Sequence, residues 1–256
     1  MKKLTLTLLA AAMMCAPATA QQKVKTLSTY TDKLQVEQLQ VANQTTCISR
    51  TLYAGYNSIC LPMGLTAEQL QSAARDVRVE RMAGIRQEGN TLCLYFIDCT
   101  ADGIEAGMPY LIFSPTTQVL RARSTEVKNV STELHNVTLS DGQGNRVTFG
   151  SSWESITGNS KRYGIPAKQD KEVLESVLIS TDGDKKFLPT RCGFNWDAQA
   201  ATATAIEIRH TNALPTGITT VSGDQGSKAV YDLSGRRAVN AKKGIYVVDG
   251  KKTAVK

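Results

Sequence analysis

Side chains of the kind that perform catalysis are scarce in this sequence, and those present do not fall into a catalytic spacing. His135 and His210 are the two histidines of the chain. Neither belongs to a His-Glu-x-x-His motif or stands beside an obvious carboxylate, so a zinc hydrolase is not indicated. His210 follows the alternating segment Ile206 to Arg209. We therefore predict that it is a surface residue at the end of a strand.

Three polar motifs are better explained by turns and strands than by chemistry. Ser58 lies in a segment, residues 55–59, that lacks the second glycine of a nucleophile elbow. Asp182-Gly183-Asp184 offers oxygen ligands to calcium, but no glutamate follows at the EF-hand spacing. Gly142 and Gly144 lack the third glycine of a dinucleotide-binding fingerprint. We predict no catalytic residue, no metal site and no cofactor.

Aromatic residues supply the candidates for binding. Trp153, Tyr163 and Trp196 have flat apolar faces with a polar edge, which suits stacking against a sugar. The alternative, which we prefer, is that these rings pack in the core. A glycan-acting hydrolase would also need two carboxylates ~5 to 9.5 Å apart. Asp98, Glu105 and Glu207 are available, but no sequence pattern brings them together.

The first twenty residues have the order of a secretory signal peptide. Lys2 and Lys3 are followed by an apolar run and by the small residues Ala18-Thr19-Ala20. We predict cleavage after Ala20 and an exported protein without a membrane span, since a span needs ~20 apolar residues. Lipidation at Cys15 is the rival interpretation. It is disfavoured because Met14 stands where a small residue is expected.

The basic charge of the chain is concentrated at its C-terminal end. The whole sequence has 30 Lys and Arg and 23 Asp and Glu. Removal of residues 1–20 takes away two lysines and no acid. Residues 228–256 then hold eight basic residues against Asp232 and Asp249, so the body of the chain is close to neutral. This pattern predicts a solvated basic tail and no nucleic-acid binding.

Five cysteines remain after cleavage: Cys47, Cys60, Cys93, Cys99 and Cys192. An odd number leaves at least one free or paired between molecules. On one continuous strand Cys93 and Cys99 would be roughly 20 Å apart, too far for a disulfide. Their alternation with Tyr95 and Ile97 predicts small buried residues on one strand face. A bridge between Cys47 and Cys60 stays open as an alternative.

The core of the sequence predicts a mainly β fold with one short helix. Thr66 and Gln69 form a capping-box pattern, with Leu65 and Leu70 placed as a hydrophobic staple around a helix from Ala67 to about Arg75. Asp141 to Asn145 predicts a hairpin turn. A further strand is expected from Ile104 to Phe113, bent at Ala106-Gly107. The other strand candidates are residues 36–41, 46–53, 57–61, 78–82, 92–97, 134–139, 146–149, 173–180 and 205–209.

These elements predict an antiparallel β-sandwich or barrel, plus a small C-terminal β module. We divide the chain into a signal peptide (1–20), a poorly ordered lead-in (21–34), a β-rich main domain (35–213), a linker (214–227) and the C-terminal module (228–256). A single main domain is preferred over two small cores meeting near Glu126.

The centre of the main domain resembles a known module. Residues 54–63, AGYNSICLPM, and residues 104–112, IEAGMPYLI, are similar to the "AGWNTLCLPF" and "IEAGKPYLI" strands that recur in secreted and surface proteins of Bacteroidetes. Tyr56 replaces the usual Trp and Met108 the usual Lys. Residues 149–153 and 186–189 fit the same family more loosely. The resemblance implies an exported β-rich protein and transfers no catalytic residue.

The C-terminal module resembles the sorting domain of the type IX secretion system. Strands are predicted at residues 230–233, 245–248 and 253–255, with turns at Ser234-Gly235 and Asp249-Gly250. In that family the tail is removed as the cargo reaches the surface. The module is shorter than the family's at its N-terminal side, so a relic packed on the main domain is the alternative. Its motif residues are Tyr231, Asp232, Gly235, Arg236, Gly244, Tyr246, Gly250 and Lys251.

Together these features predict a non-catalytic protein of the cell surface or extracellular space, acting in binding or adhesion. Its expected partners are a glycan or a host or surface protein, and the type IX secretion machinery if the tail is functional. The alternatives are a structural component of a surface assembly, a glycan-acting hydrolase, and a periplasmic location.

Overall fold

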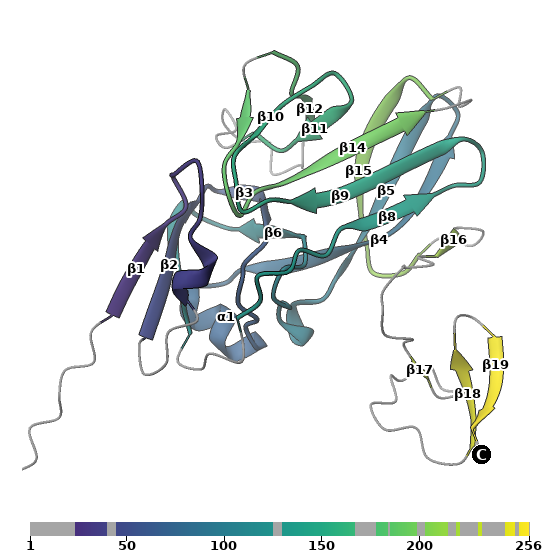
Figure 1. The fold of residues 1–256 in the computed structure, drawn as a ribbon. Coiled ribbons are helices and arrows are strands. Elements are labelled where there is room, and N and C mark those ends of the chain that lie inside the picture. The colour runs from purple at the N-terminus through teal and green to yellow at the C-terminus, as the bar shows by residue number, and fades with distance from the viewer. Residues whose placement is uncertain are drawn as a thin grey trace, which may run out of the picture.

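The structure is a computed structural model, and it confirms a mainly β fold with one α-helix (Figure 1). It describes residues 24–39, 45–124, 130–166, 178–183, 185–198, 203–214, 219–220, 230–231, 244–248 and 251–255. The predicted signal peptide and its cleavage site at Ala20 lie outside these residues.

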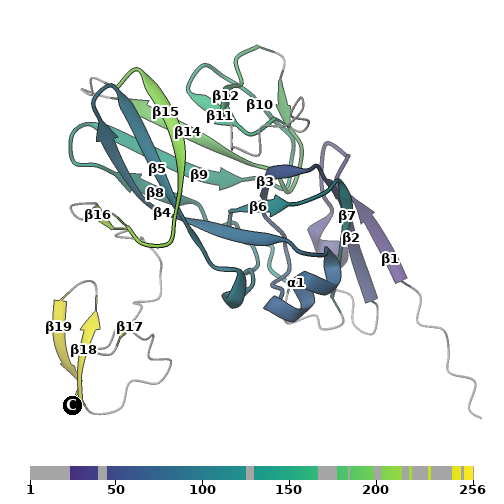
Figure 2. The ribbon, with the colours of Figure 1, turned by 180° about the vertical axis from the view of Figure 1, so that it is seen from behind.

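Two larger sheets face one another in the centre of the molecule (Figures 1 and 2). The six-stranded sheet runs β15 (Ala205–Thr211), β5 (Thr91–Asp98), β4 (Arg78–Glu88), β6 (Tyr110–Ser114) and β3 (Gly55–Ile59), with β16 (Thr219–Thr220) paired to β4. The five-stranded sheet runs β12 (Ile179–Ser180), β11 (Arg162–Gly164), β14 (Cys192–Ala198), β9 (Asn145–Ser151) and β8 (Val137–Ser140).

Three smaller sheets complete the described strands. One consists of β1 (Val24–Ser28), β2 (Thr45–Leu52) and β7 (Gln118–Ser124). A second pairs β10 (Ile156–Thr157) with β13 (Lys186–Phe187). The third contains the strands of the predicted C-terminal module, β17 (Val230–Tyr231), β18 (Gly244–Val248) and β19 (Lys251–Val255).

The interior holds two hydrophobic clusters that share strands. Phe96 of one large sheet meets Phe149 and Phe194 of the other, edge to face, at 5.6 and 6.0 Å between ring centroids. A second cluster lies under the β1-β2-β7 sheet and includes Ile48 of β2 and Ile112 of β6. Strands β3, β4 and β6 contribute side chains to both clusters.

The helix α1 (Ala67–Ala73) forms as the sequence predicts. The Thr66 hydroxyl accepts from the Gln69 amide, and the Gln69 side chain accepts from the Thr66 amide. Leu65 and Leu70 are both buried in the second cluster. The hairpin at Asp141 to Asn145 is also confirmed, since it joins the antiparallel strands β8 and β9.

Several local predictions are wrong. Of the strand predicted at residues 36–41, residues 36–39 form the 3-10 helix η1 (Val36–Leu39) instead, which buries Val36 and Leu39. Residues 40 and 41 lie outside the described residues. The lead-in contains β1, which pairs in parallel with β2, as β15 does with β5. Ile104 makes only an isolated bridge to Leu65, and β6 begins at Tyr110.

The five cysteines among the described residues are unpaired and buried, so the bridge between Cys47 and Cys60 does not form in this structure. Cys99 does not continue the face of Cys93, because β5 ends at Asp98. Cys99 instead stands at the start of the 3-10 helix η2 (Thr100–Asp102) with a φ of −131° and a ψ of 24°.

Candidate functional site

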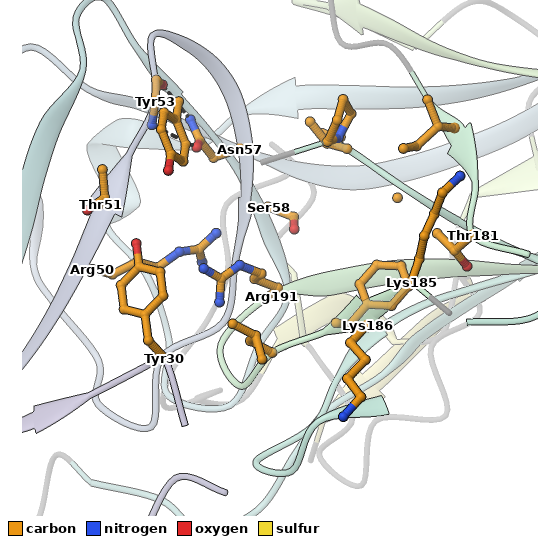
Figure 3. A pocket seen from close by; sticks show the side chains of 16 residues that line it. Tyr30, Arg50, Thr51, Tyr53, Asn57, Ser58, Thr181, Lys185, Lys186 and Arg191 are labelled. Carbon is orange, nitrogen blue, oxygen red and sulfur yellow. Dashed lines mark hydrogen bonds between the residues drawn. The ribbon is translucent and has the colours of Figure 1, made fainter. Parts of the chain in front are cut away.

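A cavity of about 450 Å³ lies where the end of β2 and strand β3 meet the segments around β12 and β13 (Figure 3). Two arginines, Arg50 and Arg191, place their guanidinium groups next to one another at this cavity (Figure 3). We call them the arginine pair and the space in front of them the arginine cavity. The chemistry of the site follows from how these two cations are held.

Arg50 is a cation on the buried face of a strand. Alternation along β2 puts it on the same side as Ile48 and Leu52, two residues of the hydrophobic interior. Only 4% of Arg50 is exposed. Residues of this type are almost never fully buried unless they are paired.

The charge of Arg50 has little compensation from the protein. One nitrogen, Nη1, donates to the carbonyl oxygen of Thr190 at 2.7 Å, while Nε is buried without a partner. Burial, and next the field of Arg191, lower the pKa of Arg50 to about 9. The group therefore carries its charge at neutral pH. No carboxylate of the described residues forms an ion pair with either member of the arginine pair.

Arg191 is held at the mouth of the same cavity. Its Nη1 donates to the carbonyl oxygen of Thr29 at 3.5 Å, and its guanidinium lies 5.1 Å from the centroid of the Tyr30 ring. Burial lowers the pKa of Arg191. The two neighbouring guanidinium groups have no carboxylate beside them among the described residues, so the site carries a local excess of positive charge. The two charges also repel one another.

Tyr30 responds to that positive field. Its burial acts to raise its pKa, but hydrogen bonding with Thr51 and the charges of Arg191 and Arg50 outweigh burial, and the pKa of Tyr30 is lowered. The lowered pKa of Tyr30 shows that the electrostatic potential at its hydroxyl is positive, as it would be for an anionic ligand in the cavity.

The backbone beside the arginine pair is strained. Thr190 is fully buried and has a φ of +69°, which is a rare conformation for a β-branched residue. Its hydroxyl has no partner, while its carbonyl oxygen accepts from Arg50 and from the amide of Cys60. Strain of this kind concentrates at functional sites, where the surrounding structure holds it.

The remaining wall of the arginine cavity is largely apolar. Phe187, Leu188, Ile165 and Ile179 line it. Two lysines also line it, but they have partners elsewhere: Lys185 donates to the carbonyl oxygen of Ser180 at 2.9 Å, and Lys186 lies 3.8 Å from the Asp32 carboxylate. The cavity therefore suits a ligand that combines a negative group with an apolar surface.

A second cavity of about 210 Å³ shares Phe187 and Arg191 with the first. It lies over the outer face of β9 and β14, where Gly150 stands opposite Gly193 in the strand pairing. Because the two glycines carry no side chains, we call it the glycine cavity.

The aromatic candidates Trp153, Tyr163 and Trp196 line neither cavity. All three are partly buried and pack against the core. The structure brings Tyr163 and Trp196 together, 6.0 Å between ring centroids, and leaves Trp153 apart, with its indole nitrogen donating to the Thr132 carbonyl. Of the tail motif, Tyr231, Gly244, Tyr246 and Lys251 lie in strands β17 to β19. Asp232, Gly235, Arg236 and Gly250 fall outside the described residues.

A polar cluster on β4 and β15 also escaped the sequence analysis. The Glu80 carboxylate accepts from the Tyr56 hydroxyl at 3.0 Å and lies in contact with Nδ1 of His210, whose ring stacks on Tyr56. His210 is thus exposed near a strand end, as predicted, but it has a carboxylate beside it that only the tertiary fold supplies. No cavity described here opens onto this cluster.

The arginine cavity could have been suspected from sequence. An arginine at the middle of the alternating positions Ile48, Arg50 and Leu52 is a cation in an apolar series. Arg191 offers no such signal, because its partner in the site comes from the fold.

Over the part of the chain that the structure describes, no three or more His, Cys, Asp or Glu residues gather in a way that could hold a metal ion. No helix in those same segments is long and apolar enough to cross a bilayer. In comparisons with known proteins, no family model matches this chain, and no curated protein or solved structure matches it either.

Proposed function

We propose that this chain is a non-catalytic binding protein, exported to the cell surface or the extracellular space, whose arginine cavity binds the negative group of its ligand. The observation that carries the proposal is the arginine pair: two adjacent cations, one of them 4% exposed with an unpaired nitrogen and neither with a carboxylate among the described residues. A buried charge of this kind is costly unless a counter-charge is supplied. A ligand anion would supply it.

Export and a surface location rest on the signal-peptide pattern of residues 1–20 and on the two resemblances described above. A non-catalytic role is supported by the composition of the arginine cavity. Its charged groups are arginines and lysines, and among the described residues no histidine or carboxylate lines it to act as a general acid or base.

Calorimetric titration tests the proposal. The protein from Gln21 onward is titrated with sulfate, with acetate and with benzoate, which joins a carboxylate to an apolar ring. We expect benzoate to bind more tightly than acetate. We also expect R191Q to weaken binding roughly ten- to a hundredfold, because a hydrogen bond to a charged group contributes ~1.5 to 3 kcal/mol.

The matched control is R146Q, which removes the same charge from an exposed position at the opposite end of β9. R146Q should leave the affinity unchanged. If none of the three anions binds, or if R146Q weakens binding as much as R191Q does, the arginine cavity is not an anion site.

A further inference from the structure

The glycine cavity adjoins the arginine cavity, and its floor is built differently. On the outer face of β9 and β14 two neighbouring cross-strand pairs are Gly150 with Gly193 and Thr148 with Asn195. The side chains of Asn136 and Phe187 pack over the first pair, and the second pair places a hydroxyl and an amide next to them. The result is a site lined by an aromatic ring and by polar side chains.

The two glycines make room for the side chains that pack over them. A Cβ atom on Gly150 would come within 2.1 Å of the Asn136 amide oxygen, and one on Gly193 would come within 3.0 Å of the Phe187 ring. Asn136 and Phe187 therefore occupy the space that side chains at these positions would need. Phe187 separates the two cavities and lines both.

Two separate hydrogen bonds position polar groups at the glycine cavity. Arg162 donates through Nε to the Asn195 amide oxygen at 2.9 Å, and the Thr148 hydroxyl is bonded to that of Thr138 at 3.0 Å. Among the described residues no hydrogen bond engages the Asn195 side-chain NH₂, which can therefore donate to a ligand. Amide and hydroxyl groups beside an aromatic ring suit a sugar ring, which has hydroxyls at its edge and an apolar face.

From these observations, and resting on the proposed function, we infer that the ligand is an acidic saccharide. Its carboxylate or sulfate meets the arginine pair, and the next sugar of the chain occupies the glycine cavity. At about 210 Å³ the glycine cavity is below the ~300 to 1,000 Å³ of a typical small-molecule pocket, so it holds one ring-sized group.

Two other anionic ligands fit less well. An acyl chain would find a polar floor in the glycine cavity instead of an apolar one. An extended peptide that binds by strand addition needs an open sheet edge. Strands β9 and β14 are interior strands of the five-stranded sheet, so their main-chain groups are already paired.

The test compares saccharides that differ in one feature. The protein from Gln21 onward is titrated with glucuronate, with glucose, and with a disaccharide in which glucuronate is linked to a neutral sugar. A disaccharide with a sulfate in place of the carboxylate and a tripeptide with a free carboxylate complete the set. We expect no binding of glucose and at least tenfold tighter binding of one of the acidic disaccharides than of glucuronate.

Asn195→Ala should remove most of the gain from the second sugar, and its thermal unfolding, compared with that of the wild type, is the control for folding. R191Q should weaken every acidic ligand. If glucuronate binds but neither disaccharide binds more tightly, or if the tripeptide binds best, the saccharide inference fails while the anion site stands. If no anion binds, both fail.

Discussion

Arg50 is a charged side chain buried beneath a small sheet, which is unusual. A neutral residue would pack there without the cost of taking a guanidinium out of water. The position is enclosed by apolar residues of β2, and the protein supplies one carbonyl oxygen and no carboxylate from the described residues. Arg50 therefore lowers the free energy of unfolding of the free protein, and a bound anion would raise it again.

This view makes a prediction about the free protein. Removing one partner of a buried ion pair destabilises a fold by about 3 to 5 kcal/mol, whereas replacing a poorly compensated buried charge by an apolar group of similar length is often neutral or stabilising. We expect Arg50→Met to keep the free energy of unfolding unchanged or raise it by ~1 kcal/mol, while anion binding is lost. Urea denaturation at a constant m-value measures this. A loss of 3 kcal/mol or more would mean that Arg50 has a counter-charge in the free protein.

Glu88 predicts how the protein responds to acid. Hydrogen bonds from Tyr95 and then from Arg86 lower the pKa of Glu88 to about 2, from an ordinary value of 4.5. Because the folded pKa is the lower one, the charged carboxylate stabilises the fold above about pH 4.5, and this stabilisation is lost as the pH falls toward 2.

We expect the difference in unfolding free energy between the wild type and Glu88→Gln to shrink across that interval. When both proteins also carry Tyr95→Phe, which removes the first donor, the difference in unfolding free energy should shrink at a higher pH. Denaturant titrations at a series of pH values provide the measurement. Parallel stability curves for the wild type and Glu88→Gln would show that Glu88 has no such role.

At the scale of single residues, the sequence predicts what depends on neighbours in the chain. The cap at Thr66 and the turn at Asp141 were found because their partners lie three or four residues away. The contact of Glu80 with His210 and that of Arg50 with Thr190 were missed, because each joins distant segments. Most of the candidate site belongs to this second group.

Among the elements, the turn after η2 depends on one glycine. Gly103 has a φ of +75° and a ψ of −151°, and an added Cβ would come within 2.2 Å of the Leu65 carbonyl oxygen. That carbonyl accepts the hydrogen bond from the Ile104 amide that holds this turn against the start of α1. Only glycine occupies such a backbone conformation without strain.

We expect Gly103→Ala to destabilise the protein by ~3 kcal/mol or more, through backbone strain and a displaced bridge. Gly89→Ala is the control, since Gly89 also has a positive φ, +59°, but nothing lies within 4 Å of an added Cβ. Its cost should be about 1 kcal/mol. Thermal unfolding of the two variants measures both costs. Equal losses of stability would contradict a steric role for Gly103.

The elements that the sequence analysis missed have identifiable causes. In η1 the buried residues Val36 and Leu39 are three apart, which is the spacing of a 3-10 turn, although both residue types favoured a strand. Strand β14 does alternate, with Cys192 and Phe194 buried. Its glycine and asparagine, Gly193 and Asn195, masked the signal by resembling a loop. Those two residues are the ones that shape the glycine cavity.

For the whole molecule, the two hydrophobic clusters are joined by the strands that they share. A strand such as β6 places Leu111 in the cluster between the large sheets and Ile112 in the cluster under β2. Neither core could be removed without exposing the far face of these shared strands. The short strand candidates and the turns between them predicted the β-rich class, but the sharing depends on sheet order, which no local pattern encodes.

The fate of the tail is the prediction that belongs to the whole molecule. If residues 228–256 are a sorting signal, the protein recovered from the surface or medium fraction of its own host should end near Val221, as measured by intact mass. A chain that retains residue 256 in the periplasm would contradict both surface export and tail removal. The anion-binding proposal would be unaffected.

The pairing of β15 with β5 also bears on the order in which the chain folds. Strand β5 can complete its outer edge only when Ala205 reaches Thr91, and β14 must arrive before β9 has both neighbours. Until then β5 is an open, apolar edge that other chains can join. Contacts between such distant segments make folding slow. A chain threaded through a membrane from its N-terminus would therefore expose this edge for most of its passage, and its yield should depend on a chaperone that covers β5 until residue 211 has emerged.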